Sequence, residues 1–228
     1  MNFTSGYFTT SVGKKFVVAV TGVLLFGFVI FHMIGNLQVY IGPEKFNAYA
    51  KFLKDLGPLL WVARIGLLVA VLLHIGFTIQ LARENRAARP VAYAYMKTKQ
   101  ASSASRFMVM SGLTVMAFIV YHLLHFTLGV TNPEYLEFTY NLKGEQVHDA
   151  YAMFVSGFSV PIVSAFYILS VGLLCWHLSH GVASLFQTLG VDSPKHEPNI
   201  RKAAIAFSLL IFIGNTSMPL AVLFGFVK

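Results

Sequence analysis

Residues 16–41 read FVVAVTGVLLFGFVIFHMIGNLQVYI, a run without Asp, Glu, Lys or Arg. A helix rises about 1.5 Å per residue, so about 20 apolar residues are enough to cross the hydrocarbon of a bilayer. Further stretches of this kind occupy about 59–82, 107–130, 156–188 and 203–227. The sequence therefore predicts an all-α polytopic membrane protein, with five transmembrane helices forming a bundle in one domain over residues 1–228.

The composition agrees with a lipid environment. Hydrophobic residues make up 56% of the chain and charged residues 11%, and the mean hydropathy is +0.67. A soluble domain of 228 residues could not bury that much apolar surface. The net charge of +8 could suit a nucleic-acid partner, but the basic residues lie in short segments between apolar stretches. We therefore expect a membrane and no nucleic acid as the partner.

The basic residues also predict the orientation, because Lys and Arg in short loops are retained on the cytoplasmic side. Three segments carry most of them: Lys14 and Lys15; Arg83, Arg86, Arg89, Lys97, Lys99 and Arg106; Lys195, Arg201 and Lys202. The other two loops are mixed or acidic. We expect a multi-pass protein of the bacterial cytoplasmic (inner) membrane, with its N-terminus cytoplasmic and its C-terminus outside.

Details of three segments refine this picture. The first span is longer than the apolar region of a signal peptide and lacks a clear cleavage site, so we expect a retained helix. The polar, basic segment from Ala82 to Ser105 is a candidate docking face at the cytoplasmic surface. Pro161 lies near the start of the fourth span, where it predicts a kink or a helix that begins outside the hydrocarbon.

The intramembrane histidines are the candidate functional residues, because ionisable side chains in hydrocarbon are costly. The single cysteine, Cys175, excludes a CxxCH haem attachment and an iron–sulfur cluster held by this chain alone. Six of the eight histidines lie within the predicted spans: His32, His74, His122, His125, His177 and His180.

Helix direction sorts four of these histidines by depth. His32 and His122 lie toward the outer ends of their helices, whereas His74 and His177 lie toward the inner ends of helices that run the opposite way. The two layers are on the order of 10 Å apart. Two imidazoles fill both axial positions of a haem iron. Two histidines in each layer are therefore typical of two stacked b haems that carry electrons.

Two ambiguities remain at this level. His122 and His125, and likewise His177 and His180, form H-x-x-H pairs on one helix face, which would also suit zinc or copper. A transition-metal transporter normally places carboxylates in its path, and we expect every Asp and Glu to lie outside the spans. Glycines on four helices leave room for a macrocycle or allow close helix packing: Gly22, Gly27, Gly35, Gly66, Gly76, Gly112, Gly172 and Gly181.

Four segments in order along the chain resemble one known family. They are FHMIGNLQVYIGPEKFNAYA from Phe31, LLHIGFTIQLARENRAARP from Leu72, YHLLHF from Tyr121 and WHLSHG from Trp176. Together they resemble the single-chain, five-helix, dihaem cytochrome b (b558-type) anchor subunits of succinate dehydrogenases and fumarate reductases. The resemblance implies His32 and His122 as ligands of the outer haem and His74 and His177 as ligands of the inner haem.

The resemblance also implies the partners. A flavoprotein subunit with FAD and an iron–sulfur subunit would dock on the cytoplasmic face, and the chain would pass electrons through two haem b groups to or from menaquinone or ubiquinone. Candidate residues for the quinone are Tyr40, Glu44 and His125. The alternatives are a dihaem cytochrome b of another quinone-linked dehydrogenase, such as a hydrogenase or formate dehydrogenase, and a transition-metal transporter.

Overall fold

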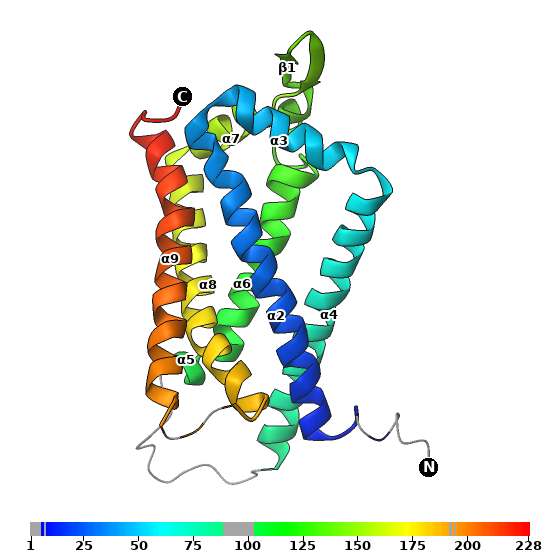
Figure 1. Ribbon diagram of the computed structural model, residues 1–228, viewed down its shortest axis with the longest axis vertical. Helices are drawn as coiled ribbons and strands as arrows, with labels where there is room; N and C mark the ends of the chain where they lie inside the picture. The colour runs from blue at the N-terminus through cyan, green and yellow to red at the C-terminus, as the bar shows by residue number, and fades with distance from the viewer. Residues whose placement is uncertain (1–5, 7, 89–102, 192, 194) are drawn as a thin grey trace.

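A computed structural model describes residues 6, 8–88, 103–191, 193 and 195–228 (Figure 1). Its elements are α2 (Ser11–Asn36), η1 (Leu37–Ile41), α3 (Pro43–Asp55), α4 (Pro58–Ala87), α5 (Ser103–Arg106), α6 (Met108–His122), η2 (Leu123–Thr127), η3 (Pro133–Glu137), β1 (Thr139–Leu142), β2 (Glu145–His148), α7 (Ala150–Phe158), α8 (Pro161–Thr188) and α9 (Glu197–Leu223). Most of the proposed docking segment, residues 89–102, lies outside the described residues.

Among the described residues, five helices are long and apolar enough to span a membrane: Ser11–Ile41, Pro58–Ala87, Met108–Thr127, Pro161–Thr188 and Glu197–Leu223. The all-α polytopic fold is therefore confirmed. The described β-structure is one antiparallel hairpin of β1 and β2, which projects from the upper end of the bundle beside α3 (Figure 1). The chain enters α2 at the lower end and leaves α9 at the upper end.

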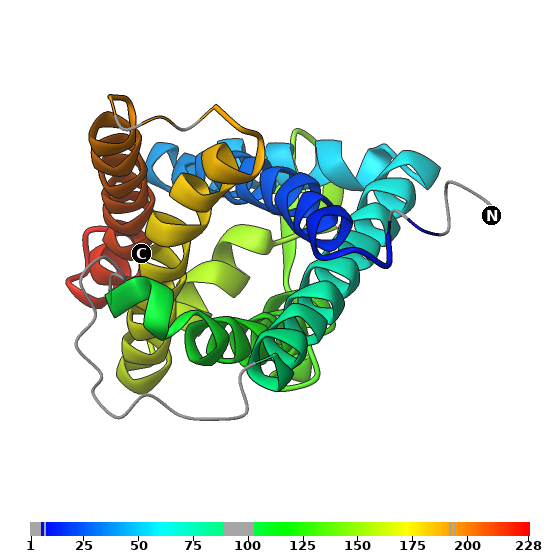
Figure 2. The ribbon, with the colours of Figure 1, turned by 90° about the horizontal axis from the view of Figure 1, so that it is seen from below.

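Four of the helices form a ring. Seen from below, α2, α4, α6 and α8 surround the centre, and α9 packs along the outside of α8 (Figure 2). The sides of the ring are α2 with α4, α4 with α6, α6 with α8, and α8 with α2. The amphipathic helix α3 crosses the upper end from α2 toward α4 (Figure 1). The ring places α2 diagonally opposite α6, and α4 diagonally opposite α8.

The helix boundaries differ from the predicted ones for identifiable reasons. Helix α2 begins before residue 16 because the side chain of Thr10 caps it, accepting from the Gly13 amide at 3.1 Å. The fourth predicted span, 156–188, is two helices. It breaks after Phe158, and α8 begins at Pro161, whose missing N–H and fixed φ suit a helix start. Of the two alternatives expected at Pro161, a kink or a new helix start, the structure has a helix that begins at Pro161.

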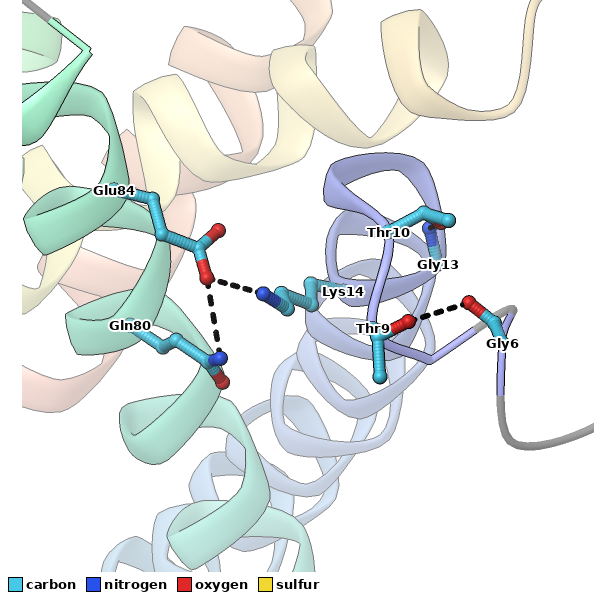
Figure 3. Close-up of polar contacts among 7 residues, drawn as sticks. All are labelled: Gly6, Thr9, Thr10, Gly13, Lys14, Gln80 and Glu84. Atoms are coloured by element: carbon cyan, nitrogen blue, oxygen red, sulfur yellow. Dashed lines mark hydrogen bonds and ion pairs between the residues drawn. The ribbon is translucent and has the colours of Figure 1, made fainter.

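An ion pair fixes α2 to α4 at the lower end. Lys14 of α2 points at α4 and donates to Glu84, which also accepts from Gln80 Nε2 at 3.2 Å (Figure 3). Because α4 continues to Ala87, Glu84 lies on a spanning helix. This corrects the expectation that every acidic residue lies outside the spans. The carboxylate serves a structural ion pair.

At the upper end, Asn47 of α3 joins that helix to the start of α7. Its side chain is fully buried and donates to Asp149 Oδ1 at 2.9 Å, while its Oδ1 accepts from the Tyr151 amide at 3.0 Å. Asp149 also caps α7 by accepting from the Ala152 amide at 2.9 Å. Apolar side chains of α3, α7, α8 and α9 form the main core around this contact.

Candidate functional site

His32 of α2 and His122 of α6 face each other across one diagonal of the ring. Their ring centroids are 5.7 Å apart and the rings are nearly perpendicular. Phe28 stacks on His32 at 5.3 Å, and Phe118 packs against His122 at 5.9 Å. The structure thus brings together the two histidines expected in the outer layer.

His74 of α4 and His177 of α8 lie on the two helices of the other diagonal. The orientation of His74 is fixed by α2. Its Nδ1 lies 3.1 Å from the carbonyl oxygen of Val18 and 3.1 Å from Oγ1 of Thr21. A carbonyl oxygen can only accept, so Nδ1 carries the proton. The lone pair of His74 is therefore on Nε2, the atom that a metal would bind.

His177 is held in a similar way by α6. Its Nδ1 lies 3.1 Å from Oγ of Ser111, and that hydroxyl donates its own proton to the carbonyl of Met108 at 3.1 Å. The hydroxyl oxygen therefore accepts from Nδ1 of His177, which again leaves Nε2 with the lone pair. Hydrogen-bonded Nδ1 and free Nε2 are typical of histidines that ligate metals.

These contacts repeat between the two halves of the ring. TGVLLFGFVIFH, residues 21–32 of α2, matches SGLTVMAFIVYH, residues 111–122 of α6, with a hydroxyl residue and glycine first and histidine last. A Cβ on Gly22 would lie 3.5 Å from His74 Cε1, and one on Gly112 would lie 3.4 Å from His177 Cε1. The helix pair α2–α4 is therefore repeated as α6–α8, with His32 equivalent to His122 and His74 equivalent to His177.

The repeat continues in α4 and α8. Both α4 and α8 begin with proline, and the same number of residues separates Pro58 from His74 and Pro161 from His177. Thr21 and Ser111 contact candidate ligand histidines, and the predictions from sequence did not name them. The internal repeat is the signal that could have found them.

The separation of the outer histidine pair and the nearby glycines fit a haem. An iron bound to one nitrogen of each ring, at about 2 Å, requires ring centres on the order of 6 Å apart, close to the His32–His122 separation. A Cβ on Gly27, Gly66, Gly76 or Gly181 would meet no described atom within 4 Å, so these backbones leave space beside them. Gly35 and Gly172 instead face the nearby rings of Tyr49 and Phe212 and serve helix packing.

The second histidine of each H-x-x-H pair has different surroundings. His125 lies in the π-helical turn η2, is 1% exposed, and has Nδ1 3.0 Å from Tyr167 Oη. Its ring packs against the rings of Phe126 and Tyr135. His180 Nε2 lies 3.0 Å from Oγ of Ser184 on its own helix.

The remaining quinone candidates lie at the upper end. Tyr40 on η1 and Glu44 on α3 are both exposed. Glu44 lines a hollow of about 440 Å³ together with Lys143, whose ammonium is 3.7 Å from the carboxylate. Among the described residues, no hydrogen bond, ion pair or ring contact joins Tyr40, Glu44 and His125 to one another.

Within the described ranges, no three His, Cys, Asp or Glu side chains are grouped so that they could hold a metal ion.

Outside the spans, Lys51 of α3 donates to Asp55 and lies 3.2 Å from Glu145 of β2. Hydrogen bonds to these two carboxylates raise the pKa of Lys51.

The fold and histidine arrangement agree with a comparison against known families. Residues 82–214, more than half of the chain, match the family described as succinate dehydrogenase/fumarate reductase transmembrane subunit. His122 and His177 lie inside the matched region, and His32 and His74 precede it. No curated protein and no solved structure matched the chain. The chain belongs to the family of succinate dehydrogenase/fumarate reductase transmembrane subunits, the membrane anchors of these quinone oxidoreductases.

Proposed function

We propose that this anchor holds two b haems and carries electrons between an iron–sulfur subunit and membrane quinone. His32 and His122 would bind the outer haem iron, and His74 and His177 the inner one. The observation that carries the proposal is the His32–His122 pair, together with the repeat that places His74 and His177 at equivalent positions on the other two helices of the ring.

The protonation states of the inner pair support this assignment. Val18 and Thr21 orient His74, and Ser111 orients His177, so each presents an Nε2 lone pair. A histidine whose other nitrogen is anchored loses less conformational freedom on binding iron and is a stronger electron donor. Bound haem would supply a one-electron couple in each layer, while the apolar helices exclude water and the histidines fix the irons.

The same observations weigh against the transporter alternative. A bis-histidine pair supplies two ligands, which suits an iron whose other four ligands come from a porphyrin. A zinc or copper site built from protein alone needs three or four ligands. Of the acidic residues on the described spanning helices, Glu84 is the nearest in sequence to a histidine of the ring. Its carboxylate is paired with Lys14.

The position of the chain in a larger complex follows from its charge pattern. We place the lower end, with Lys15, Arg83 and Arg201, on the cytoplasmic side of a bacterial inner membrane. There it would dock the FAD-containing flavoprotein and the iron–sulfur subunit. Quinone would bind at the upper end, where Tyr40 and Glu44 are exposed.

The test is a reduced-minus-oxidised spectrum of the purified protein with a haem-to-protein ratio. We expect two b haems per chain, and a preparation without haem would overturn the proposal. In the intact complex, succinate should reduce the haems and FAD should copurify. Haem reduced by hydrogen or formate, and not by succinate, would instead identify an anchor of another dehydrogenase.

A further inference from the structure

The hydrogen bonds of the inner histidine pair repeat between the two halves of the ring, but one contact of the outer pair does not. Tyr167 of α8 is 5% exposed, and its hydroxyl lies between two imidazoles, 3.0 Å from Nδ1 of His125 and 3.4 Å from Nδ1 of His122. The position equivalent to Tyr167 in the first half is Arg64, which is exposed and lies over the ring of Trp61 at 5.2 Å. The hydroxyl contact therefore belongs to the second half of the ring.

The polarity of this contact follows from counting protons. A tyrosine hydroxyl has one proton, so between two Nδ1 atoms it donates to one and accepts from the other. The shorter distance is to His125, which is enclosed by aromatic rings. With the proton donated to His125, the oxygen of Tyr167 accepts from Nδ1 of His122. The lone pair of His122 is then on Nε2, as in the inner pair.

We propose that Tyr167, with its hydroxyl oriented by His125, is the positioning residue that fixes the tautomer of His122 and lowers the reduction potential of the outer haem. This inference rests on the proposed function, because it needs His122 to bind iron. An imidazole whose N–H is hydrogen bonded donates more electron density to the metal. That donation stabilises Fe(III) relative to Fe(II).

Tyr167→Phe is the direct test, since it removes the hydroxyl and keeps the ring in the aromatic cluster. At a fixed ambient potential, the ratio of reduced to oxidised outer haem should rise about fivefold, the effect of one ordinary hydrogen bond. The inner haem should not respond. Tyr121→Phe is the matched control, because its ring packs 6.0 Å from that of Tyr167 while no hydrogen bond to its hydroxyl occurs among the described residues.

Substitutions of His125 separate orientation from packing. His125→Phe removes the acceptor and should shift the outer haem in the same direction as Tyr167→Phe. His125→Asn keeps an acceptor at the δ position and should stay closer to the wild type. The haem that responds is identified with Ser111→Ala, which should shift the other component of the titration, because Ser111 contacts His177.

Each outcome has a defined meaning. Loss of the outer haem in Tyr167→Phe, with both haems kept in Tyr121→Phe, would also support a positioning role. Unchanged potentials in Tyr167→Phe, an equal shift of both haems, or an equal effect of the control would overturn the inference while leaving the dihaem function intact. A wild-type chain without two haems would overturn the proposed function itself.

Discussion

Oγ1 of Thr21 lies 3.1 Å from Nδ1 of His74, and the carbonyl oxygen of Val18 lies 3.1 Å from the same nitrogen. The equivalent hydroxyl, Ser111, is the acceptor described for Nδ1 of His177. Removing Thr21 thus leaves His74 with a backbone acceptor, whereas removing Ser111 leaves Nδ1 of His177 without this partner.

We therefore predict that Thr21→Ala and Ser111→Ala raise the potential of the same, inner haem by different amounts. Ser111→Ala should change its reduced-to-oxidised ratio about fivefold at fixed potential, and Thr21→Ala should change it less. An optical redox titration measures both. Thr114→Ala is the control, since that hydroxyl donates to Met110 of its own helix. Shifts in different haems would contradict the equivalence of the two halves.

Removal of single ligands tests the pairing. His74→Ala or His177→Ala should each halve the haem-to-protein ratio, and the spectrum of the outer haem should be retained. In His122→Ala, the spectrum of the inner haem should be retained. The reason is that one imidazole cannot replace two axial ligands. His180→Ala should retain both haems, because His180 is bonded to Ser184 on its own helix. Haem loss in His180→Ala and retention in His177→Ala would reverse the assignment within that pair.

The two members of the Lys14–Glu84 ion pair should differ in their cost. The side chain of Lys14 is 5% exposed and that of Glu84 is 43% exposed. Glu84→Gln leaves a buried ammonium without its counter-charge, so it should lower the melting temperature in detergent more than Lys14→Met. The double variant should resemble Lys14→Met. Equal effects of the single variants would contradict this account.

A matched control for the ion pair lies on α9. Arg201 and Glu197 are both exposed and 3.0 Å apart. Exposed pairs of this kind contribute little to stability. Glu197→Gln should therefore leave the melting temperature close to that of the unchanged chain.

The Asn47 contact should be a strong determinant of stability at the upper end. Asn47→Ala removes the partner of the Tyr151 amide and one partner of Asp149. Leaving a buried donor unsatisfied costs about 1–3 kcal/mol, measurable as a lower melting temperature and faster proteolysis near α7. The control is Asn141→Ala in the exposed hairpin, whose Oδ1 accepts from Gly144. It should change stability by less than about 0.5 kcal/mol.

The number and order of the spans were predictable, because hydropathy is a local property. The depth sorting of His32, His74, His122 and His177 followed from the helical rise per residue. The surface helix α3 is joined to the start of α7 by the contact of Asn47 with Asp149, two residues that lie far apart in the sequence. Such contacts are invisible to local patterns.

Helical periodicity alone does not choose between the two histidines of an H-x-x-H pair. Helical periodicity places His122 and His125 on one face. In the structure, a π-helical turn begins directly after His122, and the widened turn directs His125 toward Tyr135 while His122 faces His32. Periodicity could not foresee that turn. The family resemblance favoured His122 from the motif YHL alone.

The diagonal placement of the histidine pairs has a mechanical consequence. Neighbouring helices form the four sides of the ring, and contacts such as Thr21–His74 and Ser111–His177 act along those sides. A four-sided frame with only its sides fixed can still shear. An iron shared by His32 and His122 would brace one diagonal near the upper end, and one shared by His74 and His177 would brace the other lower down. Haems bound in these positions would therefore resist shear of the four helices in addition to carrying electrons.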